Sequence, residues 1–246
     1  MNDIQAIFLD LGGTFRIVHE NKPYSDAAKA RIAELVGTDM SPEDFHALIE
    51  TRYEEYRKWA LRFMCESPMP YLWSRWLAFD CDRERVERNA AELTYQYRRC
   101  KGERLVVDGG VETVRELYAR GYKLGIISDL IGCDEVDEWL DNDNLRKYFC
   151  AVRQSSITML RKPHPAIYYL AAEDAKVRPE NCCFVGDNLN RDIVGAKAAG
   201  FGATVAVDYP EAAPLKLTDE NRPNAIVHSF SELLEVFPKA PKMVIG

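Results

Sequence analysis

The chain has 246 residues, of which 47% are hydrophobic and 29% charged, values that are ordinary for a globular protein. Its 39 acidic residues outnumber 32 lysines and arginines, and the resulting net charge of −7 argues against nucleic-acid and anionic-membrane partners. No apolar stretch approaches the ~20 residues that span a bilayer, and the seven cysteines include no CxxC pair, so neither a disulfide framework nor a zinc site is expected.

The first predicted element is a short buried strand at residues 4–9, which ends on an acid in the segment IFLDLGGTF. No basic residue precedes this apolar run, so the N-terminus does not resemble a signal peptide. Together with the unpaired cysteines, this pattern favours a reducing cytoplasm as the location.

The next part of the chain, from Pro23 to Cys100, has the pattern of helices. Ser41 and Pro42 are a helix start, because serine caps the first turn and proline suits its first position. Asp82 is predicted to begin a second helix, and CESPMPYLWSRWLAFD to hold a shorter one. The apolar residues that follow at helical spacing are Phe45, Leu48, Ile49, Tyr56, Trp59, Ala60 and Phe63 in the first helix, and Val86, Ala90, Leu93 and Tyr97 in the second.

After Gly102, short apolar strands alternate with helices. Strands are predicted at residues 123–128, 148–153, 182–185, 203–207 and 225–228, and helices at 111–118, 165–175, 191–199 and 231–236. This alternation is typical of an α/β fold with a doubly wound parallel sheet. Because one strand precedes the helical block, that block is an insertion. The predicted domains are a Rossmann-like core at residues 1–16 and 103–246 and a helical cap at residues 17–102.

Reactive side chains follow four of the predicted strands. They are Asp10, the pair Ser128-Asp129, Asp187 and Asp192 in VGDNLNRD, and Lys162 in RKPHP. Each alone has an ordinary structural interpretation, as a helix cap, a turn or a hydrated loop lysine. Ligands of such sheets bind beyond the carboxyl ends of the strands. The joint occurrence of these groups at that edge therefore predicts a site.

The set resembles the haloacid dehalogenase superfamily of hydrolases. Asp10-Leu-Gly-Gly-Thr14 is similar to its first motif, Ser128 to the second, Lys162-Pro163 to the third, and Gly186-Asp187 with Asp192 to the fourth. The similarity extends over nearly all of the predicted core. The helical insertion corresponds in position and class to the family's C1-type cap, but no individual cap residue can be carried over.

The resemblance implies a phosphatase with Mg²⁺ as cofactor and a small phosphorylated metabolite as substrate. Asp10 would be the nucleophile that forms an aspartyl-phosphate. Asp10, Asp187 and the backbone carbonyl of Gly12 would hold the metal, and Asp192 would orient its surroundings. Carried over in the same way, the groups that bind the phosphoryl oxygens are Ser128, Asp129, Gly13 and Lys162.

Gly12 departs from the family pattern, because phosphatases of this family usually have a second aspartate there that protonates the leaving oxygen. General acid–base help of this kind is worth ~10²–10⁴-fold. Three alternatives remain open: a working phosphatase, other chemistry such as C–P bond cleavage by a cap lysine, and a non-catalytic binding or regulatory protein. A replacement acid could be His19 or Glu20, and the lysines of the cap are Lys22, Lys29, Lys58 and Lys101.

The predicted cap says little about the substrate. Its arginines and tryptophans could line a pocket for an anionic or aromatic group, although a hydrated helix face and the cap's own core are the commoner interpretation. These residues are Arg52, Arg57, Arg62, Arg75, Arg83, Trp59, Trp73 and Trp76. Because the cap joins the core through two connections, near residues 16–22 and 101–108, we expect it to move as a lid. The sequence leaves the oligomeric state open.

Overall fold

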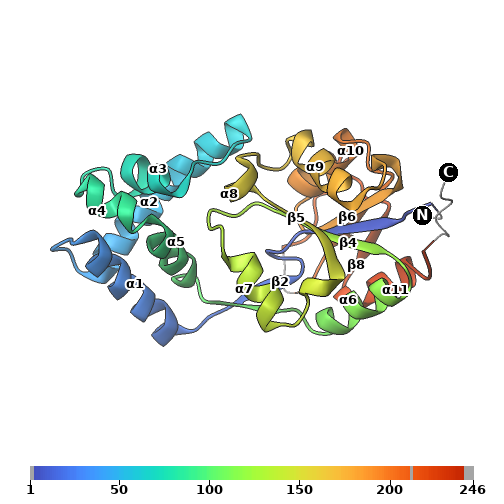
Figure 1. Cartoon of the computed structure of the whole chain (residues 1–246), viewed down its shortest axis with the longest axis horizontal. Helices are drawn as coiled ribbons and strands as arrows, with labels where there is room; N and C mark the ends of the chain where they lie inside the picture. The colour runs from blue at the N-terminus through green and yellow to red at the C-terminus, as the bar shows by residue number, and fades with distance from the viewer. Residues whose placement is uncertain (1–2, 211–212, 241–246) are drawn as a thin grey trace.

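A single parallel sheet organises the larger part of the molecule. The computed structural model describes residues 3–210 and 213–240. Its six strands pair in parallel in the order β5-β4-β1-β6-β7-β8, with helices on both faces (Figure 1). This confirms the predicted α/β fold with a doubly wound sheet, whose strand order reverses between β1 and β6. The strands are β1 Ala6–Leu9, β4 Lys123–Ser128, β5 Phe149–Gln154, β6 Cys182–Gly186, β7 Ala203–Val207 and β8 Ala225–Val227.

Both faces of the central strand are buried because its side chains alternate between two hydrophobic clusters. Ile7 and Leu9 pack in one cluster, whereas Ala6 and Phe8 pack in the other. The first cluster is covered by α6 Gly110–Ala119, α7 Glu135–Asn142 and α11 Leu233–Val236, and the second by α9 Pro165–Ala175 and α10 Val194–Ala198. The sheet is thereby fixed between two helical layers, and its carboxyl edge holds the site described below.

The helical segment has a hydrophobic cluster of its own and lies beside the sheet (Figure 1). It consists of α1 Lys22–Val36, α2 Pro42–Phe63, α3 Met69–Leu72, the π-helical turn η1 Trp73–Leu77, α4 Arg83–Arg88 and α5 Ala90–Arg99. Ser41 caps α2 as expected, since its side chain accepts the Asp44 N–H at 3.1 Å. The single helix predicted from Asp82 is wrong: Asn89, at φ −96° and ψ 7°, divides it into α4 and α5. Within the described residues, no helix is long and apolar enough to cross a membrane.

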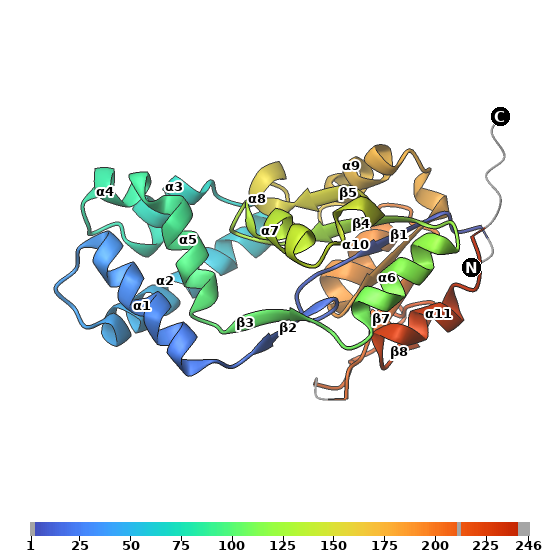
Figure 2. The same ribbon diagram turned by 60° about the horizontal axis from the view of Figure 1, so that its bottom comes forward.

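A two-stranded ribbon, which the sequence pattern does not predict, carries the chain into and out of the helical segment. It consists of β2 Arg16–His19 and β3 Glu103–Val106, paired antiparallel (Figure 2). Its position agrees with an insertion after β1. We therefore propose the division given by the sequence, with the cap at residues 17–102 and the core at residues 1–16 and 103–246.

The cap also touches the core at a third place, far from the ribbon. Cys65 and Leu160 form an antiparallel bridge. Beside it, the Glu66 N–H donates to the Met159 carbonyl at 3.0 Å and the Arg161 N–H to the Met64 carbonyl at 3.0 Å. The two connections expected from the sequence are therefore the covalent ones, and backbone hydrogen bonds add a further contact next to Lys162.

Candidate active site

The ends of three adjacent strands bring the predicted groups together. Asp10 follows β1, Ser128 ends β4, and Asp187 follows β6. These strands are neighbours in the order β4-β1-β6, and the Asp10 N–H donates to the Val185 carbonyl at 2.9 Å. The parallel register thus places Asp10 beside groups that follow it in the sequence by more than a hundred residues.

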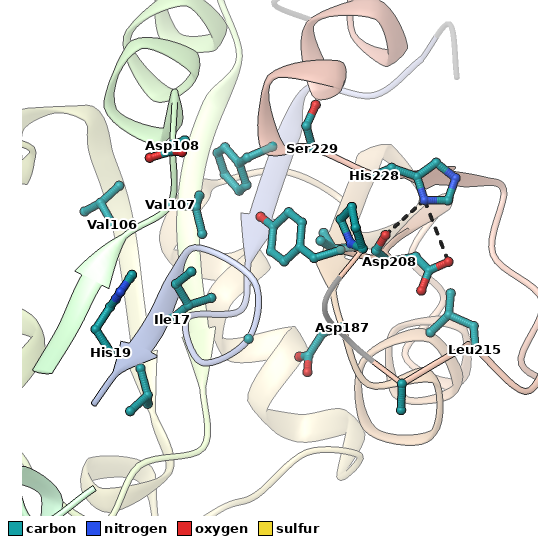
Figure 3. Close-up of a pocket in the computed structure, with 17 residues that line it drawn as sticks. Ile17, His19, Val106, Val107, Asp108, Asp187, Asp208, Leu215, His228 and Ser229 are labelled. Atoms are coloured by element: carbon teal, nitrogen blue, oxygen red, sulfur yellow. Dashed lines mark hydrogen bonds and ion pairs between the residues drawn. The ribbon is translucent and has the colours of Figure 1, made fainter. Parts of the chain in front are cut away.

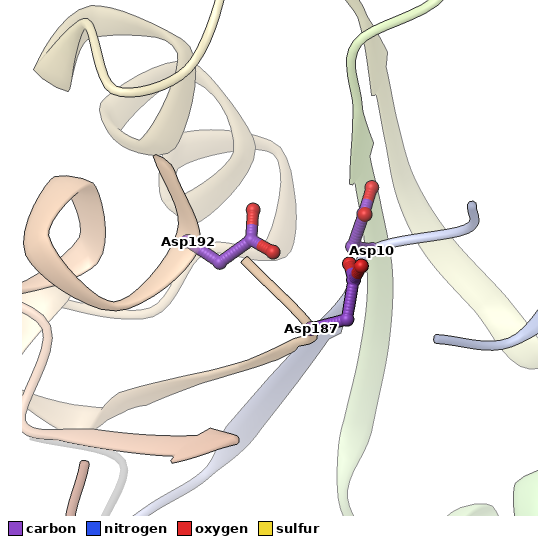
Figure 4. A group of neighbouring side chains, drawn as sticks. All are labelled: Asp10, Asp187 and Asp192. Atoms are coloured by element: carbon purple, nitrogen blue, oxygen red, sulfur yellow. The ribbon is translucent and has the colours of Figure 1, made fainter. Parts of the chain in front are cut away.

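Three carboxylates and one ammonium group form the centre of the site. Asp10, Asp187 and Asp192 each offer an oxygen within 4.8 Å of the others (Figure 4). Lys162 Nζ lies 2.9 Å from Asp10 Oδ1 and 2.6 Å from Asp192 Oδ1. Asp10 is 5% exposed, Lys162 1% and Asp192 0%, so these ion pairs are removed from water.

Burial and neighbouring charges act in opposite directions on these groups. Burial lowers the pKa of Lys162, but the charges of Asp10 and Asp192 raise it, and the net effect is a pKa above the ordinary value. Lys162 therefore stays protonated. Burial raises the pKa of Asp192, and the charge of Lys162 opposes that rise.

Ser128 and Asp129 form hydrogen bonds with different neighbours. Ser128 Oγ donates to Asp10 Oδ1 at 3.1 Å. The Asp129 carboxylate turns the other way, and its Oδ1 accepts the backbone N–H of Lys162 at 2.9 Å. A contact from Asp129 to a phosphoryl oxygen would therefore use its backbone N–H.

The two glycines after Asp10 have different surroundings. A Cβ on Gly12 would meet no heavy atom within 4 Å, and Gly12 is exposed. Gly13 has φ +80°, and a Cβ there would lie 2.5 Å from Asp187 Oδ2. Gly13 is thus required for the close approach of the backbone to Asp187, whereas the position of Gly12 has room for a side chain.

Asp187 has the surroundings of a carboxylate that lacks a cation. Thr14 Oγ1 donates to its Oδ1 at 3.4 Å, and within the described residues no lysine or arginine lies in ion-pair range. Burial and then the charge of Asp10 raise the pKa of Asp187. A hard divalent cation, which binds carboxylate and carbonyl oxygens, would compensate this pair of acids, so the residues present fit Mg²⁺.

A buried cluster beside Lys162 escapes the sequence patterns. Arg161 forms an ion pair with Glu66 of the cap and lies 3.6 Å from Asp129 Oδ2, while Arg191 lies 3.9 Å from the same oxygen. The Glu66 side chain is 0% exposed. It accepts hydrogen bonds from Tyr56 Oη and, at 2.7 Å, from Ser155 Oγ.

Glu66 gave no local signal, because it lies 95 residues before its partner Arg161. Arg161 directly precedes the lysine of RKPHP, which is the one sequence feature that could have drawn attention to it. A second ion pair between cap and core joins Arg98 to Glu135 at 2.6 Å, at a different place in the fold.

The groups considered as substitutes for Gly12 lie at the surface. His19 and Glu20 are both exposed. Each cap lysine forms an ion pair with an acid of the cap: Lys22 and Lys29 with Asp26, Lys58 with Glu55, and Lys101 with Glu50. None of these pairs involves Asp10 or Asp187, so the geometry does not favour a cap lysine acting at Asp10.

The arginines and tryptophans of the cap mostly serve the cap itself. Trp73 is buried, and Trp59 and Trp76 pack together with ring centroids 5.4 Å apart. Arg52 pairs with Asp80 at 2.7 Å. The remaining four arginines, Arg57, Arg62, Arg75 and Arg83, are exposed.

Comparison with known proteins adds independent information. A family model described as haloacid dehalogenase-like hydrolase matches residues 4–200. Glyceraldehyde 3-phosphate phosphatase of Pyrococcus furiosus is 29% identical over 242 residues, which cover 97% of this chain and 95% of that protein. Phosphoglycolate phosphatase of Escherichia coli K12 is 34% identical over 126 residues, or 50% of this chain and 47% of that protein.

Solved structures resemble the whole chain. A 2-haloacid dehalogenase from Pseudomonas syringae matches with a TM-score of 0.68 at 21% identity, covering 95% of this chain and 97% of the other. A HAD phosphatase from Thermococcus onnurineus matches with a TM-score of 0.60 at 21% identity, with the same 95% and 97% coverage. At such identities the likeness concerns the fold.

Proposed function

This chain belongs to the haloacid dehalogenase-like hydrolase family, and within that family we propose that it is a Mg²⁺-dependent phosphatase of a small phosphomonoester. The observation that carries the proposal is the buried ion pair of Asp10 with Lys162, 2.9 Å long, beside the carboxylate of Asp187. The curated relatives support the reaction class, since both are named as phosphatases of small metabolites.

Asp10 is the proposed nucleophile. Ser128 and Lys162 both contact its Oδ1, which leaves Oδ2 to attack phosphorus. As the new bond forms, the bond from phosphorus to the ester oxygen breaks, and its electron pair leaves with the organic group. Water then attacks the phosphorus of the aspartyl-phosphate, the carboxylate of Asp10 is restored, and inorganic phosphate departs.

Positive charge must offset the repulsion between a carboxylate and a phosphate dianion. Lys162 supplies a permanent charge at Asp10 Oδ1, and Asp192 holds that ammonium group in place from its other side, at 2.6 Å. When bound by Asp10, Asp187 and the Gly12 carbonyl, Mg²⁺ would supply further positive charge to the phosphoryl oxygens. The Ser128 hydroxyl and the backbone N–H of Asp129 would complete phosphoryl binding. The Gly13 N–H, which the resemblance also assigned to the phosphoryl group, donates instead to the Arg16 carbonyl at 3.1 Å.

The leaving oxygen has no carboxyl donor at Gly12, so we propose that it takes its proton from water. Substrates with a weakly basic leaving group are then favoured, because they need the proton least. A non-catalytic binding protein would use the same residues to hold its ligand but would not turn it over. C–P bond cleavage is not favoured, because no cap lysine is placed at Asp10.

A panel of phosphomonoesters, assayed with Mg²⁺ and with a chelator, tests the proposal. We expect phosphate release that requires the metal and disappears in Asp10→Asn, whose fold can be checked by circular dichroism. Wild-type activity in Asp10→Asn would remove Asp10 as the nucleophile. An absence of turnover across the panel at saturating Mg²⁺ would favour the binding protein instead.

A further inference from the structure

A cavity of about 870 Å³ opens beside Asp187, and neither Glu66 nor Arg161 lines it. One wall belongs to the β2–β3 ribbon, with Ile17, Val18 and Val106, and the opposite wall to the segments after β7 and β8 (Figure 3). The carboxylate of Asp187 points into the space between the two walls. A cavity of this volume is large enough for a small organic ligand.

The candidate active site borders this cavity through Gly13 and Asp187. Asp10, Ser128, Lys162 and Asp192 are all 5% exposed or less, whereas Asp187 is partly exposed and lines the cavity together with Gly13. Next to Lys162, Arg161 is 5% exposed and Glu66 4%, so the cap closes that direction. A substrate bound at Asp10 therefore has room for its organic part between the ribbon and the segment after β7.

The chemistry of the walls selects the kind of organic part. Most lining side chains are aliphatic or aromatic, among them Val18, Val207 and Leu215. The carboxylates that line it are Asp108, Asp187 and Asp208, its histidines are His19 and His228, and no lysine or arginine lies among the described lining residues. The His228 ring lies 2.9 Å from the Asp208 carbonyl and 3.7 Å from its carboxylate.

We propose that this cavity binds the leaving group of the substrate, and that this group is apolar and carries no second negative charge. The inference rests on the proposed phosphatase function and deepens it. Apolar walls bind an alkyl or aryl group by removing it from water. Asp187 would hold the metal, but Asp108 and Asp208 also line the cavity, with no lysine or arginine among the described lining residues, and they repel a carboxylate or a second phosphate. Esters such as phosphoglycolate are thereby disfavoured.

Two esters that differ by one charge test the inference. Phenyl phosphate and 4-carboxyphenyl phosphate have the same ring, and the carboxylate makes the second leaving group slightly less basic, which by itself would speed the reaction. We expect kcat/KM of the wild-type protein to favour phenyl phosphate by about tenfold.

A matched pair of variants assigns the preference to the cavity. Val18 and Leu105 are exposed apolar residues of the ribbon, at 48% and 46%, but Leu105 does not line the cavity. Val18→Lys should bring the two kcat/KM values within about threefold, and Leu105→Lys should leave their ratio unchanged. A wild-type protein that hydrolyses both esters equally, or two variants with the same effect, would overturn the inference and leave the phosphatase proposal intact.

A binding measurement separates the two proposals when turnover is absent. In Asp10→Asn, phenyl phosphate with Mg²⁺ should shift the methyl resonances of Val18 and Leu215 and leave those of Leu105 in place. If Val18 and Leu215 do not respond, the inference is wrong whatever the activity. If they respond while the wild-type protein hydrolyses no ester, the cavity binds the ligand and the proposed function fails.

Discussion

Replacing Gly12 by aspartate tests the most unusual feature of the site. The variant places a carboxyl group at the position where related phosphatases usually have one, two residues after Asp10. The structure has room for it, since a Cβ on Gly12 would meet no heavy atom within 4 Å. We therefore expect Gly12→Asp to fold normally and to retain the backbone carbonyl proposed as a metal ligand.

The size of the effect follows from the location of the new group. General acid–base catalysis contributes ~10²–10⁴-fold, which corresponds to about 3–5 kcal/mol of activation free energy. Gly12 is exposed, so a carboxyl group there would stay partly hydrated and less firmly oriented. We expect a gain near the lower limit, about 10²-fold, for alkyl phosphates, and little gain for aryl phosphates, whose leaving groups need no proton.

The assay measures the chemical step across a series of esters from acyl and aryl to alkyl phosphates. In the wild-type protein the rate should fall steeply as the leaving group becomes more basic, and Gly12→Asp should flatten that dependence. Gly12→Ala controls for the added side chain and should keep the steep slope. Gly13→Ala should lose activity in both cases, because its Cβ would lie 2.5 Å from Asp187 Oδ2 at a backbone φ of +80°.

Two results would refute this reasoning. A flat dependence in the wild-type protein would mean that another residue or the substrate donates the proton, and His19→Ala and Glu20→Gln would be the variants to examine next. A folded Gly12→Asp protein with normal Mg²⁺ dependence but the wild-type slope would show that the carboxyl group does not act as the acid there.

Three other predictions concern the metal, the contact at Glu66 and the cap. Asp187→Asn should raise the Mg²⁺ concentration needed for half-maximal activity, and an unchanged titration would remove Asp187 from the metal site. Glu66→Gln should lower the free energy of unfolding, measured in urea, by about 3 kcal/mol, because it leaves the buried Arg161 with Asp129 as its only acidic partner. The control Lys58→Gln, which breaks the exposed pair with Glu55, should cause no measurable change. Equal effects of the two variants would contradict the argument. Binding of a metal fluoride phosphate mimic should slow hydrogen exchange in the β2–β3 ribbon if the cap closes as a lid, and unaltered exchange there would count against closure.

The sequence by itself predicted the elements whose signals are local. A strand buried on both faces needs an unbroken apolar run, and its end is marked where the first polar group appears, as at Asp10 and Asp187. The helix at Pro165–Ala175 and the strand at Ala203–Val207 were predicted with their observed bounds. The helix predicted at residues 191–199 instead begins as a wider turn at Leu189–Ile193 before α10. The local sequence pattern therefore determines whether a segment is a helix or a strand, whereas the residues at which the element begins and ends depend on the segments packed against it.

The candidate site was predictable to the extent that strand order was. Once β4, β1 and β6 are adjacent and parallel, their carboxyl ends must meet, so Ser128, Asp10 and Asp187 come together without further information. The loop lysine Lys162 entered the predicted site as a group that follows a strand, but its role beside Asp10 was implied by the family resemblance alone.

Only the tertiary structure revealed Glu66 and the cavity. Glu66 meets Arg161 across 95 residues, and a contact between two single side chains leaves no periodic pattern in either segment. The walls of the cavity beside Asp187 come from segments around residues 17, 106, 207 and 228. In the sequence, the apolar residues of these segments cannot be told from residues that pack in a hydrophobic core. Local sequence encodes which residues are buried or capped, but an empty space between distant segments exists only after they have packed.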